Sequence, residues 1–145
     1  MNDLSEIDSL LYKNIVAVVE EGNIQHESGA YEAALERYSE SWHMLPEPKE
    51  QWDLSHWIAK CYSSLYLALG AYGEAKIWAI RAVQTKPPRE TSSFIFLGAS
   101  YLGLDEKESA YEFFKKAFEI GKKRAFQGFD GKYFGFLNGY KDKNE

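Results

Sequence analysis

The side chains best suited to chemistry are three histidines and one cysteine, and their spacing argues against a catalytic or metal site. His26, His43 and His56 fall in three separate segments, and no two stand three or four residues apart, the spacing that puts two ligands on one helix face. Cys61 follows His56 by five residues, so these two do not share a face either. A lone cysteine excludes an internal disulfide and a cysteine-based zinc cluster. We therefore expect no metal site and a buried, structural Cys61.

Two further catalytic patterns also fail. The run from Gly128 to Lys132 is too short for a phosphate-binding loop, and no strand precedes it. The many carboxylates are spread along the chain, and isolated surface carboxylates are usually solvated. We interpret the chain as non-enzymatic and expect no cofactor.

The elements that hold these residues are marked by a pattern that occurs three times, with gaps of three, four, three and five residues. Gaps of three and four place side chains on one stripe of a helix, and a small residue within the stripe lets a second helix approach closely. A turn former stands two residues before each set, which predicts an earlier helix paired with it. The sets are Tyr31, Ala34, Tyr38, Ser41 and Pro46; Tyr72, Ala75, Ala79, Ala82 and Pro87; and Lys107, Ala110, Phe114, Ala117 and Lys122, preceded by Gly29, Gly70 and Asp105.

The fold predicted from this pattern is all-α. We expect helices over about 4–28, 31–45, 51–69, 72–86, from 91 onward and 106–120, with Thr91 or Ser92 capping the fifth. Asp130 can cap a last short helix, whose apolar stripe would cover the open end of the stack. The chain is then a single domain over 1–145, with hairpins at about 4–46, 51–87 and 91–121 and a cap at about 130–140.

Composition and charge indicate where the protein is located and which class of partner it binds. The hydrophobic share is 45% and the net charge is −5; no apolar run has the roughly 18 residues of a membrane span, and the acidic N-terminus is unlike a signal peptide. We expect a cytoplasmic protein. Residues 1–50 hold eleven acidic and three basic residues, a balance that disfavours nucleic acid and favours a basic protein. The sequence leaves the oligomeric state open.

The recurring residues resemble the tetratricopeptide repeat (TPR) over roughly residues 12–121. The resemblance implies a right-handed α-solenoid that binds another protein. In the second unit, Ser63 stands where glycine is usual. The residues that carry the resemblance are Gly22, Gly29, Tyr31, Ala34, Tyr38 and Pro46 in the first unit, Gly70, Tyr72, Ala75, Ala82 and Pro87 in the second, and Phe94, Leu97, Gly98, Tyr101, Ala110, Phe114 and Ala117 in the third.

A narrower resemblance involves the linker 45–52, the pair Trp57-Ile58 and the ending 129–137. These segments are similar to those of small bacterial TPR proteins that are often encoded beside polymorphic toxins. That similarity implies an immunity protein that binds and neutralises a toxin domain, with a basic domain suited to the acidic first hairpin. The ending departs from the usual form at Phe129 and Gly131. The alternative is a general adaptor or assembly chaperone that binds a peptide or helix in its concave groove.

The candidate binding residues lie on the first helix of each hairpin, because these helices line the concave side of such a stack. Residues off the packing stripe should face the groove. Related modules that hold acidic chaperone tails use a clamp of lysines, arginine and asparagines, and at the matching positions this chain keeps only Asn23 beside Val19, Cys61, Ser92 and Phe96. We therefore do not expect that ligand. The candidates are Glu20, Asn23, His26, Glu27, Trp57, Lys60, Ser64, Ile95 and Phe96, with Cys61, Ser92 and Leu102 nearby.

Overall fold

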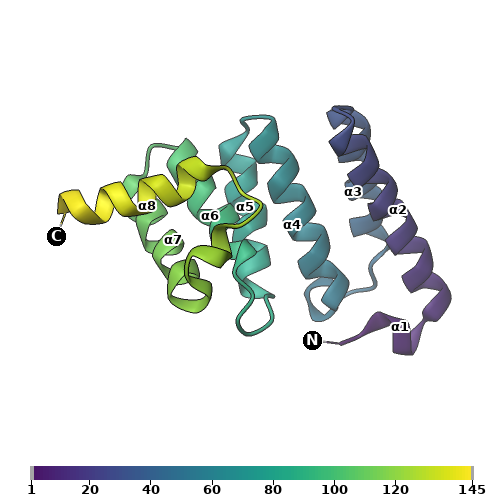
Figure 1. Ribbon diagram of the computed structural model, residues 1–145. Helices are drawn as coiled ribbons and strands as arrows, with labels where there is room; N and C mark the ends of the chain where they lie inside the picture. Colours follow the sequence, from purple (N-terminus) through teal and green to yellow (C-terminus); the bar gives the residue numbers. More distant parts are fainter. Residues whose placement is uncertain (1, 145) are drawn as a thin grey trace.

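The computed structural model describes residues 2–144, with the side chains of residues 2–140, and in this range the chain forms eight α-helices and no strand (Figure 1). A single bridge pairs Asn2 with Trp52. The all-α prediction is confirmed. The helices are α1 (Leu4–Ile7), α2 (Ser9–Glu27), α3 (Tyr31–Met44), α4 (Asp53–Ala68), α5 (Tyr72–Gln84), α6 (Ser92–Gly103), α7 (Lys107–Gly121) and α8 (Gly131–Asn144), with 3-10 turns η1 (Lys49–Gln51) and η2 (Lys122–Phe126).

Three consecutive hairpins, α2–α3, α4–α5 and α6–α7, stack along the molecule, and α8 lies across the last of them (Figure 1). Each hairpin turns at a predicted residue with a left-handed backbone. Gly29 has φ 86°, Gly70 has φ 70° and Asp105 has φ 60°. A left-handed residue after a helix lets the chain satisfy the last carbonyls and reverse direction. The turn formers therefore set the hairpin geometry.

Each outer hairpin packs an aromatic ring against a glycine. A Cβ atom added to Gly22 would lie 2.7 Å from Cε1 of Tyr38, and one added to Gly98 would lie 2.6 Å from two ring carbons of Phe114. Tyr38 and Phe114 are both 0% exposed. The helices can approach this closely only because the first helix of each pair offers bare backbone there. The alanines that stand second in each of the three sets, Ala34, Ala75 and Ala110, are fully buried, which fits the close helix approach that the pattern predicts.

One predicted helix boundary and one predicted cap are wrong. The expected helix 4–28 is broken at Asp8, whose amide still bonds to Leu4 O (2.8 Å) while its carboxylate accepts from Leu11 N (3.0 Å) and starts α2. Neither Thr91 nor Ser92 caps α6; instead the Glu90 carboxylate accepts from Ser93 N at 2.8 Å. A carboxylate can accept several hydrogen bonds at once and favours a helix N-terminus, so it displaces the hydroxyl caps.

The C-terminal segment closes the open face of the last hairpin. Phe114 contacts the rings of Phe126, Tyr133 and Phe136, and Leu137 is 4% exposed. Asp130 caps the segment by accepting from Lys132 N at 3.0 Å. The apolar stripe predicted for this helix thus faces α7, where it acts as a lid.

Substitution of Gly98 tests the ring-on-glycine contact. Gly98→Ala should lower the free energy of unfolding by about 1–3 kcal/mol, because the new methyl group overpacks Phe114. Gly73→Ala is the matched control: it also lies in a helix but has nothing within 4 Å of the added Cβ, and should stabilise by about 0.5–1 kcal/mol. Urea unfolding of both variants measures the difference. Equal effects at the two sites would mean that the close approach is unimportant.

Candidate functional site

A pocket of about 600 Å³ opens on the inner side of the stack, where α2, α4 and α6 line it together with two tyrosines of α3. We call it the inner groove. Its wall is mixed, with aromatic rings, small polar groups, one acid and one lysine. The lining residues are Asn23, His26, Glu27, Tyr31, Tyr38, Trp57, Lys60, Cys61, Ser64, Ser92 and Phe96.

The structure brings most of the predicted site residues together in this groove. Seven of the candidates share its wall, and so do Cys61 and Ser92, which come from α4 and α6. Their common position follows from the stack, because α2, α4 and α6 occupy equivalent places in successive hairpins. The seven are Asn23, His26, Glu27, Trp57, Lys60, Ser64 and Phe96.

One predicted position is wrong, and two others lie outside the inner groove. Ile95 is 0% exposed and belongs to the core formed with Ala99 and Ala110. It precedes Phe96 by one residue, a rotation of about 100° around the helix, which turns it away from the groove. Glu20 is exposed but does not line the pocket, and Leu102 lines a smaller cavity beneath α8.

The two tyrosines of α3 were not among the candidates. The Tyr38 hydroxyl donates a hydrogen bond to Asn23 Oδ1 at 2.6 Å, so the ring is core and its polar tip reaches the groove. Tyr31 stands edge-on to His26, with ring centroids 5.7 Å apart. A buried tyrosine normally keeps a partner for its hydroxyl. Because the Tyr38 hydroxyl needs a polar partner, the sequence could have predicted that its tip reaches the polar residues of the groove.

The electrostatics of the groove leave few charged groups for a partner. Burial raises the pKa of the Cys61 thiol to about 12, so it stays protonated and unreactive at neutral pH. Burial also lowers the pKa of His26, which favours the neutral ring. Lys60 Nζ already donates to Ser92 Oγ at 3.0 Å. Lys60 keeps its positive charge and is partly exposed, whereas Glu27 is exposed on the groove wall.

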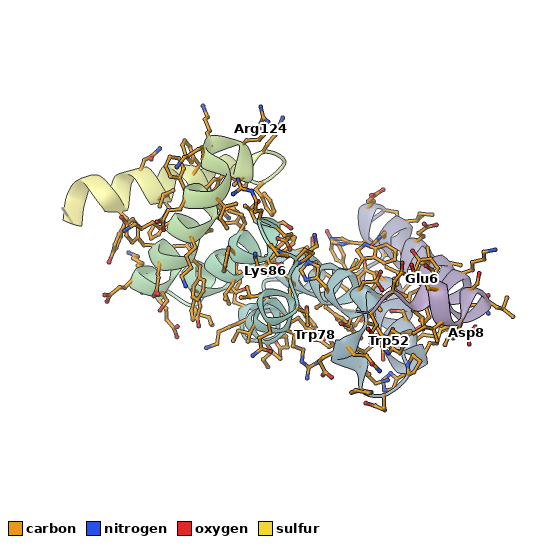
Figure 2. All side chains as sticks on the ribbon, turned by 90° about the horizontal axis from the view of Figure 1, so that it is seen from below. Glu6, Asp8, Trp52, Trp78, Lys86 and Arg124 are labelled. Atoms are coloured by element: carbon orange, nitrogen blue, oxygen red, sulfur yellow. The ribbon has the colours of Figure 1, made fainter. Side chains whose placement is uncertain are left out.

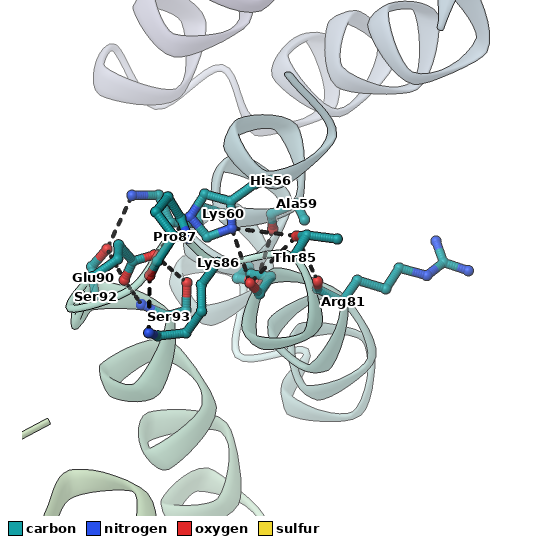
Figure 3. A network of polar contacts seen from close by, with 12 residues as sticks. His56, Ala59, Lys60, Arg81, Thr85, Lys86, Pro87, Glu90, Ser92 and Ser93 are labelled. Carbon is teal, nitrogen blue, oxygen red and sulfur yellow. Dashed lines mark hydrogen bonds and ion pairs between the residues drawn. The ribbon is translucent and has the colours of Figure 1, made fainter. Parts of the chain in front are cut away.

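Behind the groove, a polar network joins α4, α5 and the start of α6 (Figure 3). His56, 7% exposed, lies between Glu90 and Thr85. Its Nε2 is 2.6 Å from Glu90 Oε2, and its Nδ1 is 2.9 Å from the Ala82 carbonyl oxygen. Both ring nitrogens of His56 therefore face oxygen atoms. Burial alone would raise the pKa of Glu90, but hydrogen bonds from His56 and Ser93 outweigh it and lower the value to about 2.

Among the described residues, no three histidine, cysteine or acidic side chains come together in a way that could hold a metal ion. None of the helices in residues 2–144 combines the length and hydrophobicity that a bilayer span requires.

Comparison with known proteins identifies the fold. No protein-family profile and no curated protein matches the sequence. Among solved structures, the first TPR domain of Spaghetti (RPAP3), bound to the HSP90 peptide SRMEEVD, matches with a TM-score of 0.72 and 17% identity, covering 90% of this chain and 93% of that one. The TPR domain of Sgt2 from Aspergillus fumigatus gives 0.69 and 18%, covering 90% and 78%. The second TPR domain of human RPAP3, in complex with the HSP70 peptide SGPTIEEVD, gives 0.71 and 17%, covering 90% and 98%.

The architecture is therefore that of a TPR domain, a class of helical repeat modules. The predicted right-handed α-solenoid is confirmed. At this level of identity, the comparison speaks for the fold alone.

Removal of the Glu90 charge tests the network. The folded pKa of about 2 lies below the ordinary 4.5, so ionised Glu90 stabilises the fold fully above pH 4.5, and this contribution is lost as the pH falls through 2. Glu90→Gln should therefore lower the free energy of unfolding at pH 7 by roughly 3 kcal/mol, and the gap from wild type should shrink below pH 4.5. Denaturant unfolding from pH 7 to pH 2 measures it; a constant gap would contradict the assignment.

Proposed function

We propose that the chain is a non-enzymatic, single-domain binding module that takes a segment of another protein in the inner groove. The observation that carries the proposal is the groove itself: a hollow of about 600 Å³ lined by Trp57, Phe96 and Tyr31 together with small polar groups. Aromatic anchors beside polar groups are typical of protein-binding surfaces. Two of the structurally similar TPR domains were solved with bound peptides, which supports this class of partner.

The chemistry of the groove favours a basic or amphipathic segment. Glu27 lines the groove, and Glu20 and Glu21 are exposed on the same helix. Of the residues that the structure describes, Lys60 is the single lysine on the groove wall, and its ammonium donates to Ser92; positions that could hold further cations carry Cys61 and Phe96. An acidic tail would find little to pair with here, whereas a basic segment would be steered toward the acidic first hairpin.

For the particular partner, we propose a toxin domain with a basic surface, which the chain would neutralise in the cytoplasm as an immunity protein. The support is the similarity of the linker and the C-terminal ending to toxin-associated TPR proteins, together with the acidic first hairpin. Co-expression with the product of the gene directly upstream tests it. Rescue of cell growth and co-purification of the two chains are expected, and lack of both would reject this partner.

The second candidate is an adaptor or assembly chaperone. It is favoured by the structural similarity to TPR domains that were solved with HSP90 and HSP70 peptides. An adaptor would bind short peptides without inhibiting any toxic activity. A growth-rescue assay therefore separates the two candidates, while the groove remains the expected binding site in both.

Two groove variants test the site once a partner has been captured. Trp57→Ala should weaken binding by at least about tenfold, mainly through faster dissociation, because an aromatic anchor is lost. Glu27→Lys should slow association, and raised salt should have the same effect on the wild type, since exposed charges are screened beyond about 8–10 Å at physiological ionic strength. Surface plasmon resonance separates the two rates.

The matched control is Glu112→Lys, which makes the same charge change on an exposed site of α7. It should leave both rates nearly unchanged, and thermal melts should show that all three variants are folded. Binding that is indifferent to salt, to Glu27→Lys and to Trp57→Ala would place the partner on another face.

A further inference from the structure

The N-terminal end of the stack leaves an apolar helix face without a covering element. Leu10 is 71% exposed and Ile24 is 68% exposed on α2, and Ile7 on α1 is 67% exposed. Leu10 and Ile24 are fourteen residues apart, which returns to nearly the same side of the helix at a distance of roughly 21 Å. Helix α2 packs on α1, α3 and α4, and no further helix lies outside it (Figure 1). Their shared position at the uncovered end of the stack makes these side chains candidates for a contact surface.

The charged side chains around this apolar stripe are mainly acidic, although Lys13, also exposed on α2, stands among them. Glu6, Glu20 and Glu21 are exposed beside it, and within the described residues none of the three has an ion-pair partner. We call these acids together with Ile7, Leu10 and Ile24 the N-terminal face. The acids outnumber the lysine, so this face suits an occupant that offers apolar groups and positive charge together.

The opposite end of the chain offers that combination. A pocket of about 550 Å³ lies between η2 and α8, with Phe126 and Phe134 among its lining and Lys123 and Arg124 beside them. Lys123 Nζ lies 5.7 Å from the centroid of the Phe134 ring. Arg124 is exposed and has no carboxylate within ion-pair distance among the described residues. We call this hollow the C-terminal pocket.

The two surfaces lie on distant parts of the molecule. Figure 2 shows Glu6 and Asp8 at the end formed by α1, and Arg124 on the far side of Trp78 and Lys86 from them. One copy of the chain therefore cannot bring its own two surfaces together, whereas two copies can.

We propose that the N-terminal face of one copy docks into the C-terminal pocket of the next, so that the chain assembles head to tail. Leu10 of the N-terminal face would enter the aromatic pocket, and Lys123 and Arg124 would meet the acidic side chains of that face nearest to it. A repeat stack gains stability by covering its terminal faces, and opposite charges set the direction of contact. The contact is heterologous, so each added copy leaves both surface types free at the ends.

Sedimentation velocity of the full chain at increasing concentration tests the assembly. The wild type should grow beyond a dimer in low salt and dissociate as salt is raised. Leu10→Arg removes the N-terminal face, and Arg124→Glu removes the C-terminal pocket; each variant alone should sediment as a monomer. An equimolar mixture should form dimers and nothing larger, because each variant keeps one intact surface.

The control Lys107→Glu changes the same charge at an exposed site outside the C-terminal pocket, and its assembly should match the wild type. A wild type that stays monomeric at all concentrations overturns the proposal. This holds even if a basic partner protein is found to bind the N-terminal face. If the wild type assembles but the mixture of the two variants forms no dimer, the contact is not head to tail, and this result also overturns the proposal. If Lys107→Glu loses assembly as fully as Arg124→Glu does, the loss reflects the net charge of the chain and not the C-terminal pocket, which also contradicts the proposal.

Discussion

The close approach of two helices at a residue with almost no side chain is the constraint on which the rest of this structure depends. In the first and third hairpins, Tyr38 and Phe114 fill the space over Gly22 and Gly98. The equivalent positions of the second hairpin hold two small residues instead, Ser63 on α4 and Ala79 on α5, both fully buried. In the outer hairpins, one helix contributes a large ring where the other has no side chain, and in the middle hairpin both helices contribute small side chains. These contacts set how closely the two helices of each hairpin approach. The approach in turn sets the direction in which α2, α4 and α6 present their remaining side chains.

The hairpins are joined to one another by different chemistry at the two junctions. Between the first and second, Trp78 stacks on Tyr62 at 3.9 Å between centroids and meets Trp42 edge-on at 5.0 Å, with Arg81 over its face. Between the second and third, the buried His56–Glu90 pair takes this role. Aromatic stacking tolerates small shifts, whereas a short polar contact between a histidine ring and a carboxylate depends more narrowly on position. The inner groove spans both junctions.

Sequence reasoning could place the hairpins and most of the groove because both follow from helical periodicity. It failed where a residue's partner is distant in sequence or where periodicity is weak. Helix α6 is buried on most sides, so the stripe gave no reason to separate Ile95 from Phe96. The sequence does not single out Glu90 as the cap of α6, because its carboxylate is positioned next to His56, which lies on another hairpin. The break at Asp8 could have been read from its ability to start a helix, but the apolar stripe on both sides concealed it.

Among the four tryptophans of the chain, only Trp57 lines the inner groove. Trp52 is 6% exposed in the first core, and Trp42 and Trp78 are packed against each other. Indole emission shifts with the polarity around the ring, so three of the four emitters stay in constant surroundings while the fourth senses whatever enters the groove. The intrinsic fluorescence of the protein should therefore report binding in the inner groove without a label and without any substitution.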